Sequence, residues 1–207
     1  MEPNGLFITF EGGDGAGKTT QIGLLTDWLN TSRKHPPLVT REPGGSPLGV
    51  SIRQMLLHGT ETITPRAEAL LFAADRAHHV ASVIRPALEA GRDVVCDRYI
   101  DSSVAYQGAG RVLDAQEVEN LSLWASDNLV PDLTVLLDIP VAVGRARRGQ
   151  VQDTIESEAD EFHERVRQGF LRPARRDPSR YLVLDAQQHR RVLQAAIHER
   201  VASLLTQ

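Results

Sequence analysis

Short apolar runs alternate with longer segments of helical periodicity along the whole chain. Two runs, 94–96 and 133–137, are nearly continuous and suit central strands that are buried on both faces. Strands that alternate with helices in this way are typical of a parallel sheet covered by helices on both sides. The pattern predicts five strands, at 6–10, 38–41, 93–96, 133–137 and 181–184.

The segments between the strands repeat their apolar residues with the spacing of an amphipathic helix. Pro86 lies inside the longest of them and should bend that helix or mark a break. Between residues 147 and 158 the apolar spacing is lost, which predicts a surface loop; it is either an idle loop or a lid over a site. The expected helices are 17–30, 48–57, 65–90, 115–128, 141–148, 159–175 and 190–205.

The first apolar run leads directly into the pattern Gly-x-x-x-x-Gly-Lys-Thr, which is the P-loop that binds polyphosphates. Glycines let the backbone wrap the phosphates with its N–H groups, and the next helix points its N-terminus at the same anions. Lys18 would reach the β- and γ-phosphates, and the Thr19 hydroxyl would bind Mg²⁺. The residues expected to form this nucleotide site are Gly12, Gly13, Asp14, Gly15, Ala16, Gly17, Lys18, Thr19 and Thr20.

Two further polar clusters, at 41–45 and 97–99, directly follow predicted strands. Ligands of parallel sheets bind outside the carboxyl ends of the strands, so these clusters should meet the P-loop. Asp97 could hold the Mg²⁺ shell, and the Arg98 guanidinium could bridge two phosphoryl groups. The alternative is a strand-end ion pair. Arg41 could equally form a salt bridge with Glu42 or Asp97.

Composition narrows the classes of partner. A net charge of −4 over 207 residues gives no general attraction to nucleic acid or to membranes. No run approaches a membrane span and no signal peptide is recognisable, so we expect a cytoplasmic protein with one domain, 1–207.

Cys96, the one cysteine, is expected to be a buried core residue. His78 and His79 point to different helix faces, which predicts surface or interface positions rather than a metal site.

Five segments together resemble bacterial thymidylate kinases. They are 10–20, 40–45, 72–76, 97–99 and 102–108, and the similarity continues in order through most of the chain. The resemblance implies a P-loop kinase fold, a five-stranded parallel sheet with helices on both faces and a short lid at 147–158. It also implies transfer of phosphate from ATP to dTMP with Mg²⁺, and a homodimer formed through the helices near 65–90 and 102–109.

The resemblance assigns roles at the dTMP site. Phe72 would stack on thymine, although from the pattern alone it is expected to be a core residue. Arg76, on the same helix face, would bond to a base carbonyl or to the monophosphate. Gln107 carries both a donor and an acceptor for the O4 and N3–H edge of thymine. The implied dTMP-binding residues are Glu42, Pro43, Arg53, Phe72, Arg76, Arg98, Ser102, Ser103, Tyr106 and Gln107.

The implied catalytic set is Lys18, Arg98, Asp14, Arg148 and Arg147, and it departs from the family pattern at two positions. The family places a catalytic arginine either in the P-loop, where this chain has Gly15, or in the lid, where it has Thr154. Arg147 or Arg148 would therefore have to reach the γ-phosphate. Two alternatives remain, another nucleoside-monophosphate kinase and a non-catalytic P-loop regulator. The latter would need a guanine-reading Asn-Lys-x-Asp, which the sequence lacks.

Overall fold

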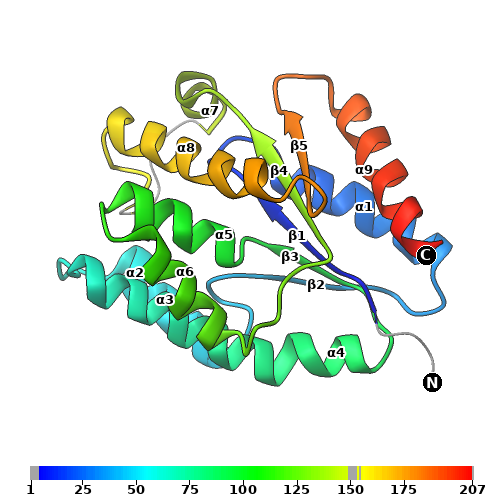
Figure 1. Cartoon of the computed structure of the whole chain (residues 1–207), viewed down its shortest axis with the longest axis horizontal. Coiled ribbons are helices and arrows are strands. Elements are labelled where there is room, and N and C mark those ends of the chain that lie inside the picture. The colour runs from blue at the N-terminus through cyan, green and yellow to red at the C-terminus, as the bar shows by residue number, and fades with distance from the viewer. Residues whose placement is uncertain (1–4, 149–152, 154, 207) are drawn as a thin grey trace.

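The computed structural model describes residues 5–148, 153 and 155–206, and of Arg148 only the backbone. Its parallel sheet has the strand order β2-β3-β1-β4-β5 (Figure 1). Each strand that the apolar pattern predicts is present, with ends shifted by at most one residue. The strands are β1 (Phe7–Glu11), β2 (Leu38–Arg41), β3 (Val94–Asp97), β4 (Leu133–Asp138) and β5 (Tyr181–Asp185).

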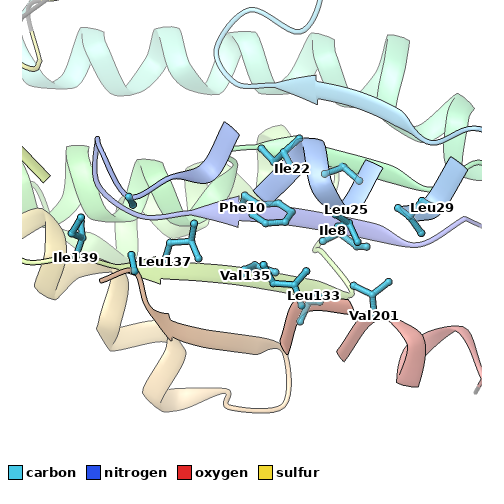
Figure 2. Packing of buried hydrophobic residues seen from close by; sticks show 14 residues of the cluster. Ile8, Phe10, Ile22, Leu25, Leu29, Leu133, Val135, Leu137, Ile139 and Val201 are labelled. Atoms are coloured by element: carbon cyan, nitrogen blue, oxygen red, sulfur yellow. The ribbon is translucent and has the colours of Figure 1, made fainter. Parts of the chain in front are cut away.

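One face of the sheet packs against α1 (Lys18–Ser32) and α9 (Arg190–Leu205). Alternate strand residues point to this side because side chains along a strand alternate between its faces. Figure 2 shows Ile8 and Phe10 of β1 meeting Leu25 of α1, with Val135 from the neighbouring strand β4 beside them. These side chains are fully buried, so this layer anchors the P-loop between β1 and α1.

The opposite face packs against α8 (Asp160–Arg176), α5 (Ile100–Ser103) and the π-helix η2 (Val104–Gly110) that continues α5. The set of helices predicted from periodicity omits 100–110. Its residues are buried almost all round, so the segment has no amphipathic pattern to reveal it. The resemblance had placed a dimer surface near 102–109, but α6 (Ala115–Ala125) and α8 already cover this segment within the chain.

The long helix predicted at 65–90 is present but changes its hydrogen bonding. It runs as α3 (Pro65–His79), a π-helical turn η1 (Val80–Ile84) and α4 (Arg85–Glu89). The Arg85 N–H donates to the Val80 carbonyl, five residues back. Pro86 follows at once and has no N–H to donate, so the chain accommodates it with a wider turn instead of a break.

Three further helices complete the described part of the chain: α2 (Pro47–His58), α6 and α7 (Val141–Arg148). The Asp114 carboxylate caps α6 by accepting hydrogen bonds from the backbone N–H groups of Gln116 and Glu117. The predicted end of α6, at residue 128, is three residues too late. Asp127 and Asn128 have φ angles of 50° and 55°, which a helix does not accommodate.

The strand order decides where the chemistry lies. β3 lies between β1 and β2, so the loops that follow these three strands meet at one edge of the sheet. Cys96, in β3, is fully buried, as the apolar run predicts. Within the described residues, no helix has the length and apolarity that a membrane crossing requires.

Candidate active site

A cavity of about 420 Å³ opens at this edge of the sheet. The loops after β1, β2 and β3 form one side of it, and residues of α2, α3, α5 and η2 form the other. The structure thereby brings together most residues that the sequence singled out. Those in the cavity wall are Asp14, Gly15, Gly17, Lys18, Thr19, Glu42, Pro43, Arg53, Phe72, Arg76, Asp97, Arg98, Ser102, Ser103, Tyr106, Gln107 and Arg147.

Four expected nucleotide-binding residues lie outside this wall. Gly12 and Gly13 line a smaller neighbouring hollow that also borders Asp14. Ala16 is buried in the core, and Thr20 is exposed on the first turn of α1. The P-loop is thus shared between the cavity, the smaller hollow and the core beneath it.

The P-loop packs closely on the end of β4 and on α7. A Cβ atom at Gly12 would lie 2.3 Å from the Leu137 carbonyl oxygen, and one at Gly15 would lie 2.3 Å from that of Gly144. Gly15 also has a φ of 80°. An arginine at position 15 would therefore clash with backbone, which gives a physical reason for the first departure from the family pattern.

Lys18 lies across the mouth of the P-loop. Its Nζ donates hydrogen bonds to the carbonyl oxygens of Gly12, at 2.9 Å, and Gly13, at 3.1 Å. Burial and the nearby Arg98 lower the pKa of Lys18. The ammonium is thereby held beside the loop that would wrap a polyphosphate.

The Arg98 guanidinium faces the same loop. It donates to Asp14 Oδ1 at 2.5 Å and to the Gly12 carbonyl at 3.2 Å, and lies 5.1 Å from the ring centre of Tyr106. Burial alone would lower the pKa of Arg98, but Tyr106, Asp14 and Asp97 raise it well above its usual value. The side chain therefore stays a cation inside the cavity.

Glu11, which the sequence analysis did not assign to the site, holds Arg98 in place. Arg98 has a φ of 68°, an unfavourable angle for a residue with a side chain. On the far side of that turn, Glu11 accepts hydrogen bonds from the N–H groups of Tyr99, at 2.7 Å, and Ser102, at 3.2 Å. The Ser102 hydroxyl also donates to Glu11, at 2.6 Å. Burial and the neighbouring Asp101 raise the pKa of Glu11 to about 7.

Asp97 and Thr19 are the residues expected at a metal. Asp97 Oδ1 is buried in the cavity wall and has no hydrogen-bond partner within the described residues. The Thr19 side chain is exposed at the same cavity. No group of three or more metal-ligating side chains exists in the described ranges. An unpaired carboxylate oxygen and a hydroxyl fit Mg²⁺, which keeps several waters and takes few protein ligands.

A second cationic group lies near the loop after β2. Arg53 of α2 donates to the Pro43 carbonyl at 3.0 Å, and burial together with Arg41 lowers the pKa of Arg53. Arg41 also lines the cavity. Within the described residues it forms neither of the two salt bridges considered above, with Glu42 or with Asp97. With Arg98, these side chains give the middle of the cavity a positive charge suited to a phosphate monoester.

At the far end of the cavity, Arg76 is almost completely buried, with 1% of its surface exposed. Its guanidinium donates to Glu42 Oε2 at 2.9 Å and to the Ser122 and Ser103 hydroxyls. Arg76 also bonds to the Tyr99 carbonyl. These contacts fix the guanidinium in the cavity wall and occupy most of its N–H donors. The main contact of Glu42 and of Ser103 at this end is therefore the hydrogen bond that each accepts from Arg76.

His79 corrects a prediction. We expected both histidines of the pair on the surface or in an interface, and His78 is exposed, but His79 is fully buried within the chain. Its Nδ1 meets Glu42 Oε1 at 3.0 Å and its Nε2 meets the Thr40 hydroxyl at 2.7 Å. The polar partners come from β2 and the following loop, which sequence spacing alone cannot place beside α3.

Phe72 and Gln107 line the same end of the cavity from different elements. Phe72 is half-buried: it lines the cavity and also contacts the apolar cluster under α8. Gln107 is 1% exposed and its Nε2 donates to Glu68 Oε1 at 2.8 Å. Tyr106, one residue earlier, lies over Arg98 between the two ends of the cavity.

The predicted lid is described in part. Arg147 lines the cavity from α7, and its Nη1 donates to the Ala186 carbonyl at 2.8 Å. Asp153, Ile155 and Glu156 also border the cavity. The side chain of Arg148, residues 149–152 and Thr154 lie outside the described residues, so the second departure from the family pattern is not addressed by the structure.

Comparisons with known proteins agree on one family. The sequence model of the thymidylate kinase family matches residues 10–197. A thymidylate kinase of Clavibacter michiganensis subsp. michiganensis is 58% identical over 204 residues, covering 97% of this chain and 96% of the relative. One of Cutibacterium acnes is 54% identical, with 97% and 98% covered. The crystal structure of thymidylate kinase from Ehrlichia chaffeensis is 33% identical, with a TM-score of 0.80, and the match covers 96% of this chain and 99% of that one.

Proposed function

This chain belongs to the thymidylate kinase family, and from that premise we propose how its cavity carries out the reaction. The protein transfers the γ-phosphate of ATP to dTMP. The observation that carries our assignment of residues is the continuity of one 420 Å³ cavity, which runs from the P-loop to Phe72 and Gln107. A phosphate donor at one end and a pyrimidine at the other would bring the two phosphates together near Arg98.

At the P-loop, the chain's own contribution is charge and position. Phosphoryl transfer needs little covalent help from the protein, so catalysis depends on holding the two substrates in line and stabilising charge. Lys18 and the N–H groups of residues 12–20 bind the ATP phosphates. Asp14 holds the Arg98 guanidinium, and Arg98 bridges donor and acceptor phosphates.

Asp97 and Thr19 would hold Mg²⁺ at this end of the cavity. The buried, unpaired Oδ1 of Asp97 supports this role, because an orphaned carboxylate oxygen in a cavity wall calls for a cation or its water shell. When bound, the metal neutralises charge on the phosphates of the donor. Glu11 keeps the turn after Asp97 in the conformation that points Arg98 at the same phosphates.

The acceptor lies toward α3 and η2. Arg53, Arg98 and the loop that carries Glu42 and Pro43 bind the monophosphate, and Ser102, Ser103 and Tyr106 border the sugar. Phe72 stacks on thymine, while Arg76 and Gln107 meet its polar edge. A buried wall that hydrogen-bonds to the base rejects a wrong base strongly, because its own polar groups would then be unpaired.

Residues 147–158 act as the lid, with Arg147 or Arg148 as the arginine that meets the γ-phosphate. The presence of Arg147 and Asp153 at the cavity supports this placement. Since the P-loop backbone leaves no room for an arginine at position 15, the lid is the remaining source within the family's two arrangements.

We also propose that the protein is a homodimer through α3 and the helices beside it. Figure 1 shows α2, α3 and α6 on one side of the molecule. Leu48 and Met55 of α2, Leu70 of α3 and Trp124 of α6 are exposed apolar side chains, and Trp124 has 80% of its surface exposed. Large apolar residues on one set of neighbouring helices are typical of an interface.

The substrate assignment is tested by thermal unfolding of the protein with dTMP, dUMP, dCMP and AMP. A ligand that binds only the folded state raises the melting temperature, and at equal concentration the ligand that binds more tightly raises it more. We expect dTMP to stabilise the protein most, dUMP less, and dCMP and AMP little. Equal stabilisation by all four would contradict the base contacts that we assign to α3 and η2.

A further inference from the structure

The amide of Gln107 is held in one orientation. Its Nε2 donates to Glu68 Oε1 at 2.8 Å, while its Oε1 has no partner among the residues that the structure describes. Gln107 lines the cavity, whereas Glu68 lies behind the wall and does not reach the cavity. The amino group of the amide therefore faces away from the cavity, and the carbonyl oxygen is the polar atom left for a ligand.

Glu68 imposes this orientation because it accepts hydrogen bonds only. The side chain is 6% exposed, and Arg111 donates to both of its oxygens, from Nε at 3.2 Å and from Nη2 at 3.1 Å. A carboxylate in such a pair has no hydrogen to give. If the Gln107 amide turned over, its carbonyl oxygen would face the carboxylate, and a buried acceptor pair of this kind is strongly unfavourable.

Arg111 is fixed in turn. It forms an ion pair with Glu158, the last residue of the predicted lid, and lies 5.0 Å from the ring centre of Phe162. Burial alone would lower the pKa of Arg111, but its hydrogen bonds to Glu68 and Glu158 raise it. Glu68 thus has a permanent cationic partner, and its Oε1 accepts from both Arg111 and Gln107.

We propose that Glu68 is a specificity-determining positioning residue that makes Gln107 present a hydrogen-bond acceptor to the base. This inference rests on the proposed placement of the dTMP base beside Gln107. Thymine carries a hydrogen on N3, which the Gln107 carbonyl can accept. Cytosine has a lone pair on N3, which would face that carbonyl. Glu68 therefore favours thymine and uracil over cytosine without touching the substrate. It also refines the expectation that Gln107 supplies a donor and an acceptor equally.

The test compares kcat/KM for dTMP, dUMP and dCMP in the wild type, Glu68→Gln and Glu68→Met. A glutamine at position 68 can donate or accept, and the thioether of a methionine is only a weak acceptor, so both variants free the Gln107 amide to turn. We expect the dTMP/dCMP ratio to fall about tenfold. The dTMP/dUMP ratio should stay unchanged, because both bases carry N3–H and O4. Each ratio is measured within one variant, so any loss of folded protein cancels.

Two controls separate the causes. Glu158→Gln removes the other acidic partner of Arg111 without touching Gln107 and should keep the wild-type dTMP/dCMP ratio. Gln107→Leu removes the amide and should lower that ratio. If Gln107→Leu lowers it but both Glu68 variants keep the wild-type value, the role of Glu68 is overturned. If Gln107→Leu leaves it unchanged, the base does not lie beside Gln107, and the proposed placement fails together with the inference.

Discussion

The two ends of the cavity are built in different ways. At the phosphate end, defined by Lys18, Thr19, Asp97 and Arg98, every functional residue lies at the end of a strand or in or directly after the turn that follows it. At the base end, defined by Phe72, Arg76 and Gln107, the side chains come from α3 and η2. Glu42 and Ser122, from other segments of the chain, hold Arg76. Glu68, behind the cavity wall, holds Gln107. Local sequence therefore specifies the phosphate chemistry, whereas contacts between distant residues specify the choice of base.

This contrast predicts that substitutions at the phosphate end lower the rate of phosphoryl transfer. Substitutions at the base end should instead change the preference among nucleoside monophosphates. The largest effect should come from Lys18→Ala. Removing one phosphate-binding cation should lower kcat on the order of 10³-fold, because positioning and charge neutralisation carry most of the catalysis. A coupled assay of ADP release measures it. The dTMP/dCMP ratio should not change, and near-normal turnover would remove the P-loop lysine from the mechanism.

Glu11 supports the phosphate end from behind the cavity wall, because its carboxylate joins the turn that carries Arg98 to α5. Burial and the neighbouring Asp101 raise the pKa of Glu11 in the folded protein to about 7, above its usual value of 4.5. A raised pKa means that Glu11 favours folding below about pH 4.5 and loses that contribution as the pH rises through 7. Relative to Glu11→Gln, the wild type should lose on the order of 3 kcal/mol of unfolding free energy over this range.

Urea unfolding of both proteins from roughly pH 5 to pH 8 measures this difference. Glutamine fits the site, because its carbonyl can accept the two backbone hydrogen bonds and the Ser102 hydroxyl can turn to accept the third. Glu89→Gln, an exposed position at the end of α4, controls for removal of a carboxylate. A difference between wild type and Glu11→Gln that does not vary with pH would show that Glu11 is not the titrating group.

Phe72→Ala probes selection at the base end. Loss of an aromatic contact with the base should raise KM for dTMP about tenfold, since stacking contributes about 1–3 kcal/mol, while KM for ATP should change little. Leu71→Ala is a matched control, because Leu71 packs against the same apolar cluster but does not line the cavity. Equal increases in KM for dTMP in both variants would mean that Phe72 acts only as a core residue.

The lid arginines should give the smallest effect. Arg148→Ala should lower kcat several-fold to about tenfold with little change in either KM, because an arginine that meets the γ-phosphate on closure acts mainly in the transition state. A smaller decrease is expected for Arg147→Ala, and Thr154→Arg should leave activity intact or raise it. Arg145→Ala is the control, since Arg145 pairs with Asp160 at 2.5 Å outside the main cavity. Single-turnover rates equal to the wild type in both alanine variants would contradict the role of the lid.

The sequence was informative where function depends on short-range spacing. Strand ends and the P-loop are defined by consecutive residues, so the sheet edge and the positions of Asp97 and Arg98 could be predicted without coordinates. Glu11 directly precedes the P-loop motif, but nothing in the spacing indicates that the Glu11 carboxylate reaches across to Ser102, which is 91 residues away in the sequence.

Three features could not be predicted because they depend on tertiary packing. The helix over 100–110 is buried on nearly every side, so it lacks the alternation that reveals other helices. Arg76 looked like a residue free to meet a ligand, yet its partners Glu42, Ser122 and Ser103 come from three separate segments. Glu68 was missed for the same reason, since its contacts with Gln107 and Arg111 span about 40 residues.

One measurement tests the central claim that the two ends of one cavity bind donor and acceptor separately. ADP release by the wild-type protein is followed with ATP and, in turn, dTMP, dUMP, dCMP and AMP, and each kcat/KM is compared with that of Lys18→Ala and Gln107→Leu. We predict that Lys18→Ala lowers all values by a common factor, while Gln107→Leu changes their ratios. A change of ratios in Lys18→Ala, or a uniform loss in Gln107→Leu, would contradict the account.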